Sequence, residues 1–151
     1  MKKLILVAVA LLTLISVPAF AAVTAGVTTQ CKVDSLTTIA SHTLKLALYT
    51  QAAATLSAST TAYTATGEVT GTGYTAGGVT LSGCTATLSG STAQLTCTSP
   101  SWASSTITAD SAMIYDSTNA NHALAIFTFT SASSTSGTYS VTLPANTISE
   151  N

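Results

Sequence analysis

Residues 83–98 read GCTATLSGSTAQLTCT, in which apolar and hydroxyl-bearing side chains alternate on both sides of a central Gly-Ser pair. Successive side chains of a strand point to opposite faces, so this alternation predicts two antiparallel strands joined as a hairpin. Glycine at the first position of a two-residue loop favours a type II′ turn at Gly90-Ser91. The turn predicts the pairs Ser89 with Thr92, Leu88 with Ala93, Ala86 with Leu95 and Cys84 with Cys97.

Cys84 and Cys97 close the open end of this predicted hairpin. Counted outward from the turn, they form a non-hydrogen-bonded pair, in which Cα atoms lie about 4.5 Å apart, and a disulfide accepts that separation. Two buried free thiols are the alternative. The third cysteine, Cys31, is then free or bonded to another chain, and a bond from Cys31 to Cys84 or Cys97 stays open.

Residues 1–21 have the three-part layout of a secretory signal. Lys2 and Lys3 precede an apolar run, and Ala19-Phe20-Ala21 provides the small residues of a cleavage site. A membrane-spanning helix needs about 20 apolar residues, and Pro18 interrupts the run before that length. We expect cleavage after Ala21 or Ala22 and a secreted mature chain without a membrane span.

Charge is scarce throughout the sequence. Asp, Glu, Lys and Arg make up 6% of the residues, against about 25% in an average globular domain. The sequence instead contains 31 threonines and 20 serines, and the β-branched side chain of threonine favours extended backbone. There is no arginine, so the clustered cations that bind nucleic-acid phosphates are missing. We therefore expect an all-β protein that binds no nucleic acid and associates with copies of itself.

Residues 22–34 predict an extended N-terminal strand. One side of the alternation holds Val23, Ala25, Val27, Cys31 and Val33. As a strand, the eleven residues Val23–Val33 extend about 36 Å, which is long for a strand. Such a segment either pairs within its own domain or adds to the open sheet edge of a neighbour, and the pattern allows both.

Residues 35–151 predict a single domain with several more strands. The expected strands are 44–49, a short one from Val79, 105–115, 123–130 and 139–143, with loops at 50–78, 116–121 and 131–137. Short strands separated by turn signals are typical of an antiparallel β-sandwich, either Ig-like or jelly-roll-like.

The order of several motifs resembles a family of small structural proteins of tailed bacteriophages. The motifs are LKLALYT (44–50), STTAYTATGEV (59–69), GTGYTAGG (71–78), LSGSTA (88–93), Trp102 and AMIYDS (112–117). The resemblance covers about residues 44–144 and implies a non-catalytic virion component. The chain departs from the family in its secretion signal, its hairpin cysteines and its end at Ile148–Asn151, where the family runs on into an apolar strand. The last departure predicts a missing edge strand that Val23–Val33 would replace.

No arrangement of residues predicts catalysis or a cofactor. His42 and His122 lie far apart and share no zinc-binding spacing with the cysteines. The serines include no Gly-x-Ser-x-Gly motif. Asp116, Asn119 and Asn121 could offer oxygen ligands to Ca²⁺, but they lack the closing Glu of a calcium loop. We expect a protein that is not an enzyme and that needs no cofactor or metal.

The leading hypothesis is a structural subunit that assembles outside the cytoplasm into a filament or pilus-like, fimbria-like appendage by donor-strand addition between copies. The alternative is an exported adhesin or carbohydrate-binding sandwich, with Tyr63, Tyr74 and Trp102 as stacking surfaces. A virion component exported for assembly is a further alternative. The sequence does not identify a receptor.

Overall fold

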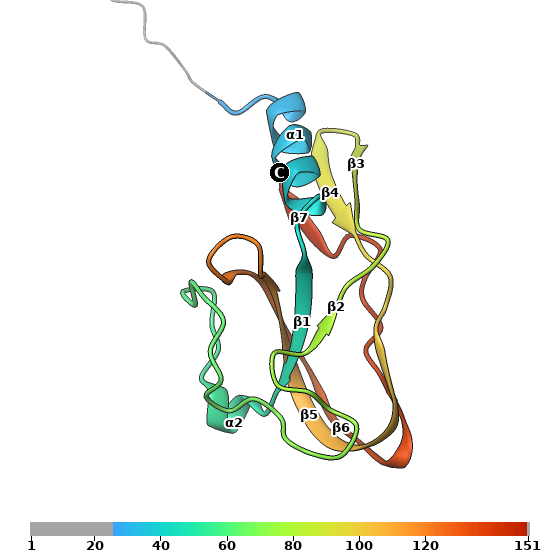
Figure 1. Cartoon of the computed structure of the whole chain (residues 1–151). Helices are drawn as coiled ribbons and strands as arrows, with labels where there is room; N and C mark the ends of the chain where they lie inside the picture. Colours follow the sequence, from blue (N-terminus) through green and yellow to red (C-terminus); the bar gives the residue numbers. More distant parts are fainter. Residues whose placement is uncertain (1–25, 151) are drawn as a thin grey trace, which may run out of the picture.

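The alternating, Thr-rich segments form two antiparallel β-sheets that pack together, so the predicted β-sandwich is confirmed (Figure 1). The computed structural model describes residues 26–150; the predicted signal sequence, Val23 and Ala25 lie outside this range. The elements in chain order are α1 (Thr29–Ala40), β1 (Leu44–Tyr49), α2 (Gln51–Ala54), β2 (Val79–Thr80), β3 (Thr85–Ser89), β4 (Thr92–Thr96), β5 (Ser101–Asp116), β6 (His122–Ser140) and β7 (Ile148–Glu150).

The larger sheet has the strand order β2-β1-β5-β6. β1 pairs along its whole length with the second half of β5, from Leu44 opposite Asp116 to Tyr49 opposite Ser111. These two central segments read as nearly continuous apolar runs because both of their faces are buried. Apart from a single bridge between His122 and Ala62, β6 pairs only with β5, which leaves it as an edge strand.

The smaller sheet has the order β3-β4-β7, and β3 and β4 are the predicted hairpin. Every pair expected within these strands is confirmed, from Ser89 opposite Thr92 to Ala86 opposite Leu95. Gly90 has a φ of 62°, the left-handed backbone that the first residue of a type II′ turn requires. β7 adds to β4 through Ile148 opposite Leu95. The sequence predicts that a sheet lacks an edge strand, but residues 148–150 form such a strand in the smaller sheet.

Two apolar clusters fill opposite faces of the larger sheet. The main cluster lies between the sheets and includes Leu46, Ala112 and Ile114. The second cluster lies on the other face, where Ala47, Met113 and Tyr115 are covered by α2 and the segment that follows it. Leu56 and Tyr63 belong to that cover. The central sheet is therefore enclosed on both faces, although the covering layer has almost no regular structure.

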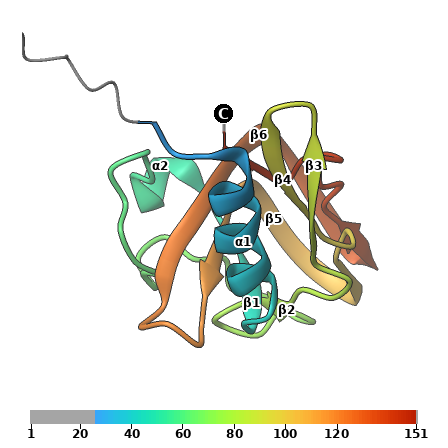
Figure 2. The ribbon, with the colours of Figure 1, turned by 90° about the horizontal axis from the view of Figure 1, so that it is seen from above.

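The expected N-terminal strand is wrong over residues 29–34, which belong to helix α1 (Figure 2). Thr28 caps the helix, because its side-chain oxygen accepts a hydrogen bond from the Cys31 N–H at 3.3 Å. The residues that pack on the core are Val33, Leu36, Ile39 and Ala40, whose spacing of three and four residues gives one helical face. Cys31 and Val33 are therefore not part of an extended donor strand. Val27 precedes the helix, outside any regular element.

β6 is longer than predicted, because it continues through residues 131–137, which were expected to form a loop. Serine-rich sequence has little strand propensity of its own, and the pairing with β5 overrides it here. The buried Ser105 of β5 contacts this stretch, with its Oγ 2.8 Å from Ser134 Oγ and 3.2 Å from Gly137 O. The predicted separate strand at 139–143 is wrong, since residues 139 and 140 are the end of β6.

Candidate functional site

Glu68 is the centre of a hydrogen-bonded cluster beside the end of β1 in the larger sheet. Its Oε2 accepts a hydrogen bond from the Tyr63 hydroxyl at 2.6 Å. Its Oε1 accepts from the Tyr74 hydroxyl and from the Gly77 N–H, both at 2.7 Å. Both carboxylate oxygens are therefore engaged, and the cluster joins three places in the irregular segment between α2 and β2.

The glycine pair at 77–78 brings this segment against the sheet. Gly78 has a φ of 72°, and a Cβ at that position would lie 1.9 Å from Leu46 O. Only glycine therefore allows the backbone to approach β1 so closely. Tyr115 of β5 adds a hydrogen bond from its hydroxyl to Gly77 O at 2.7 Å, and its ring stacks on Tyr63 with centroids 4.7 Å apart.

Burial raises the pKa of the tyrosine hydroxyls around Glu68. For Tyr49 and Tyr63 the largest cause is desolvation, and the negative charge of Glu68 raises each pKa further. Desolvation also raises the pKa of Tyr74 most, although the hydrogen bond that its hydroxyl accepts from Leu48 N–H at 2.9 Å lowers it in part. The phenols are therefore held neutral. Tyr63 and Tyr74 donate to the Glu68 carboxylate, and Tyr49 donates to Thr64 O.

Of the predicted stacking surface, Trp102 is buried and offers no face to a ligand, whereas Tyr63 and Tyr74 are partly exposed. Trp102 is only 6% exposed, and its ring lies 6.0 Å from that of Tyr74 and 6.1 Å from that of Tyr139. Tyr63 and Tyr74 are half-buried, with both hydroxyls bonded to Glu68. The sequence identified the aromatic residues but gave no signal that Glu68 gathers two of them.

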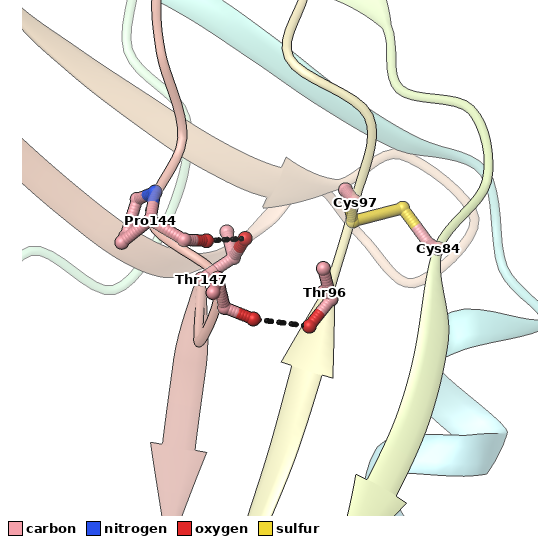
Figure 3. The surroundings of a disulfide bond; sticks show 6 residues. Cys84, Thr96, Cys97, Pro144 and Thr147 are labelled. Atoms are coloured by element: carbon pink, nitrogen blue, oxygen red, sulfur yellow. Dashed lines mark hydrogen bonds between the residues drawn. A yellow bond between two sulfur atoms is a disulfide. The ribbon is translucent and has the colours of Figure 1, made fainter.

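The predicted disulfide between Cys84 and Cys97 is present, directly beyond the ends of β3 and β4 (Figure 3). Their Cα atoms lie 4.0 Å apart. Beside the bond, the Thr96 hydroxyl donates to Ala145 O and the Thr147 hydroxyl donates to Pro144 O, which fixes the loop before β7. Cys31 is a free thiol, exposed on α1.

The free edge of β6 has few of the features that usually protect an edge strand. Natural edge strands are blunted by charged residues, by proline or by a short length. β6 is 19 residues long and contains no proline and no charged residue. No Asp, Glu, Lys or Arg occurs anywhere between Asp116 and Glu150. Register shifts interrupt its pairing with β5, but Ala125–Thr128 pair regularly with β5.

A groove of about 480 Å³ runs along this edge. It is lined on one side by Leu56, Ala58 and Thr60 and on the other by Leu124, Ala125, Ile126 and Thr128. Successive side chains of a strand point to opposite faces of the sheet. Because the groove contacts the consecutive residues Leu124, Ala125 and Ile126, it follows the edge of the sheet and does not lie on one face. The 61–63 segment closes one end, where Ala123 N–H donates to Thr61 O at 3.0 Å.

Within residues 26–150 no group of three or more metal-ligating side chains comes together, and no helix is long and apolar enough to cross a membrane. Asp116 Oδ1 accepts hydrogen bonds from the N–H groups of Thr118 and Asn119, so it caps a turn. Glu68 and Asp110 do not share a hydrogen-bond partner. Asp110 Oδ1 accepts a hydrogen bond from Gln51 N–H, whereas Glu68 accepts from Tyr63, Tyr74 and Gly77.

Comparison with family models, with curated proteins and with solved structures finds no match to this chain. The resemblance to tailed-phage structural proteins therefore stays a prediction.

Proposed function

We propose that the mature chain is a non-enzymatic structural subunit that assembles with copies of itself outside the cytoplasm, in a filament or pilus-like appendage. The observation that carries the proposal is the long, uncharged free edge of β6. An edge strand offers a row of backbone donors and acceptors, and another strand completes them.

The side chains of β6 support pairing as well. Ala125 and Phe127 pack against the core between the sheets, whereas Ile126 packs against the cluster on the other face. All three are only half-buried. A strand added at this edge would cover apolar surface on both faces at once, which is the main favourable contribution to association.

The overall charge is compatible with assembly outside the cell. After removal of the signal sequence, Lys32 and Lys45 oppose five acidic residues, so electrostatic repulsion between copies is weak. The Cys84–Cys97 disulfide suits an oxidising compartment, where such bonds form and persist.

Assembly is tested with the mature chain beginning at Ala22. Light scattering after size exclusion should give a mass that rises with concentration, and electron microscopy should show extended particles. Thr128→Lys places a charge on the exposed edge beside the groove and should hold the chain as a monomer. Thr108→Lys is the matched control: the same charge sits on an exposed position of β5 that does not line the groove, and it should leave assembly unchanged. A wild-type chain that stays monomeric at every concentration would refute the proposal.

A further inference from the structure

We propose that the groove along β6 is filled by residues Ala22–Val27 of a second copy of the chain. The inference rests on the proposed self-assembly and specifies its contact: the donor is the segment before α1, and the acceptor is the edge of β6 at residues 123–128.

The acceptor is suited to one extended strand. Six residues of β6, Ala123–Thr128, span about 20 Å, and beyond the bond from Ala123 N–H to Thr61 O this edge pairs with no strand of residues 26–150. The segment around Leu56 and Ala58 forms a wall beside this edge, so an added strand gains side-chain contacts as well as backbone pairing. The wall and the edge carry no charged side chain, and they therefore fit an uncharged, partly apolar segment.

The donor segment has the matching properties. Residues 22–27 read AVTAGV, with Val23, Ala25 and Val27 alternating with small or hydroxyl-bearing residues and with no charge. Six residues extend about 20 Å, the length of the acceptor edge. Val27 is 65% exposed, one of two large apolar side chains with high exposure in residues 26–150, so its own domain does not cover it.

α1 separates the donor segment from the turn that leads into β6. The carboxyl end of α1 lies beside the turn that leads into β6, because His42 contacts Asp116 and Thr43 N–H donates to Thr118 Oγ1 at 2.9 Å. From there α1 runs toward the smaller sheet, where it packs against β3 and β4 (Figure 1). Its length of 12 residues carries the chain about 18 Å from the turn. The donor segment therefore begins about 18 Å along the helix from the turn at which the acceptor edge starts.

Donation from one copy to the groove of the next is a head-to-tail contact. Each copy then has one donor and one acceptor, so the contact produces an open chain of subunits when the rotation does not close a ring. A symmetric contact of β6 with a second β6 would instead stop at a dimer.

Two variants that each lack one half of the contact test the inference. Deletion of residues 22–27 removes the donor and keeps Thr28, the cap of α1. Thr128→Lys blocks the acceptor and keeps the donor. Each variant alone should be a monomer, whereas an equimolar mixture should form a complex of twice the monomer mass and no longer species. Formation of that complex also shows that both variants are folded.

The outcomes separate this inference from the proposed function. If the deletion variant still assembles, or if the mixture stays monomeric while the wild-type chain assembles, residues 22–27 are not the donor and the self-assembly proposal stands. If the wild-type chain itself stays monomeric, both fail.

Discussion

His42 Nδ1 lies 2.5 Å from Asp116 Oδ2, and this contact joins the end of α1 to the turn between β5 and β6. Asp116 is buried, whereas the side chain of His42 is 27% exposed. Two further bonds reinforce the junction, because the N–H and the hydroxyl of Ser117 both donate to Thr43 O. The carboxylate of Asp116 is thus shared between a helix end and a turn.

Replacement of Asp116 should therefore destabilise the fold. Asp116→Ala removes the acceptor for Thr118 N–H, Asn119 N–H and His42, and we expect a loss of about 2–4 kcal/mol in the free energy of unfolding. His42→Ala removes only the partly exposed contact and should cost less than about 1 kcal/mol. Urea unfolding measures both variants, and equal losses would contradict this division.

Glu68 should matter more through its hydrogen bonds than through its charge. Glu68→Ala leaves Tyr63, Tyr74 and the Gly77 N–H without their acceptor, and we expect a loss of about 2–4 kcal/mol in the free energy of unfolding. Glu68→Gln keeps one acceptor oxygen and should lose about half as much. Glu150→Ala, at an exposed position, is the control and should change stability by less than about 0.5 kcal/mol. A Glu68→Ala variant as stable as this control would contradict the assignment.

The tyrosine cluster predicts a specific response to alkaline pH. Burial raises the pKa of Tyr49, Tyr63, Tyr74, Tyr115 and Tyr139 in the folded chain, whereas unfolded tyrosines titrate near pH 10. The neutral phenol is thus favoured by folding, so the stabilisation is complete below about pH 10 and is lost as the pH rises toward the folded-state values. Urea midpoints should therefore fall steadily above about pH 10, and less steeply in Tyr74→Phe. Tyrosinate absorbance that rises near pH 10 in a folded chain would refute the prediction.

The hairpin could be predicted from the sequence because every local signal agreed. The period of two, the glycine at the turn and the cysteines at the open end all specify the same register, and Ala86 lies opposite Leu95 as expected. The helix could not be read from the same pattern. Val33 fits both a strand period and a helical period. Leu36 and Ile39 distinguish the two periods, but they lie after the alternating segment.

The candidate site was predicted only in part for a similar reason. The proposed donor residue Val27 and the proposed association between copies follow from local alternation and low charge. The acceptor groove depends on where residues 56–60 settle against β6, about 65 positions later in the chain, and no local pattern encodes that contact. The cluster around Glu68 depends likewise on the close approach of Gly78 to β1.

The alternation of the donor segment predicts which of its side chains enter the groove. In an extended strand Val23, Ala25 and Val27 share one face, and Thr24 lies on the other. Val27→Asp would bury a charge between Leu56 and Ile126, so it should abolish assembly at concentrations where the wild-type chain polymerises. Thr24→Asp adds the same charge on the opposite face and should weaken assembly far less. Mass measured by light scattering across a concentration series compares the two variants. Equal effects of both would show that the segment does not bind as a strand with one face in the groove, because the strand geometry requires that neighbouring positions differ.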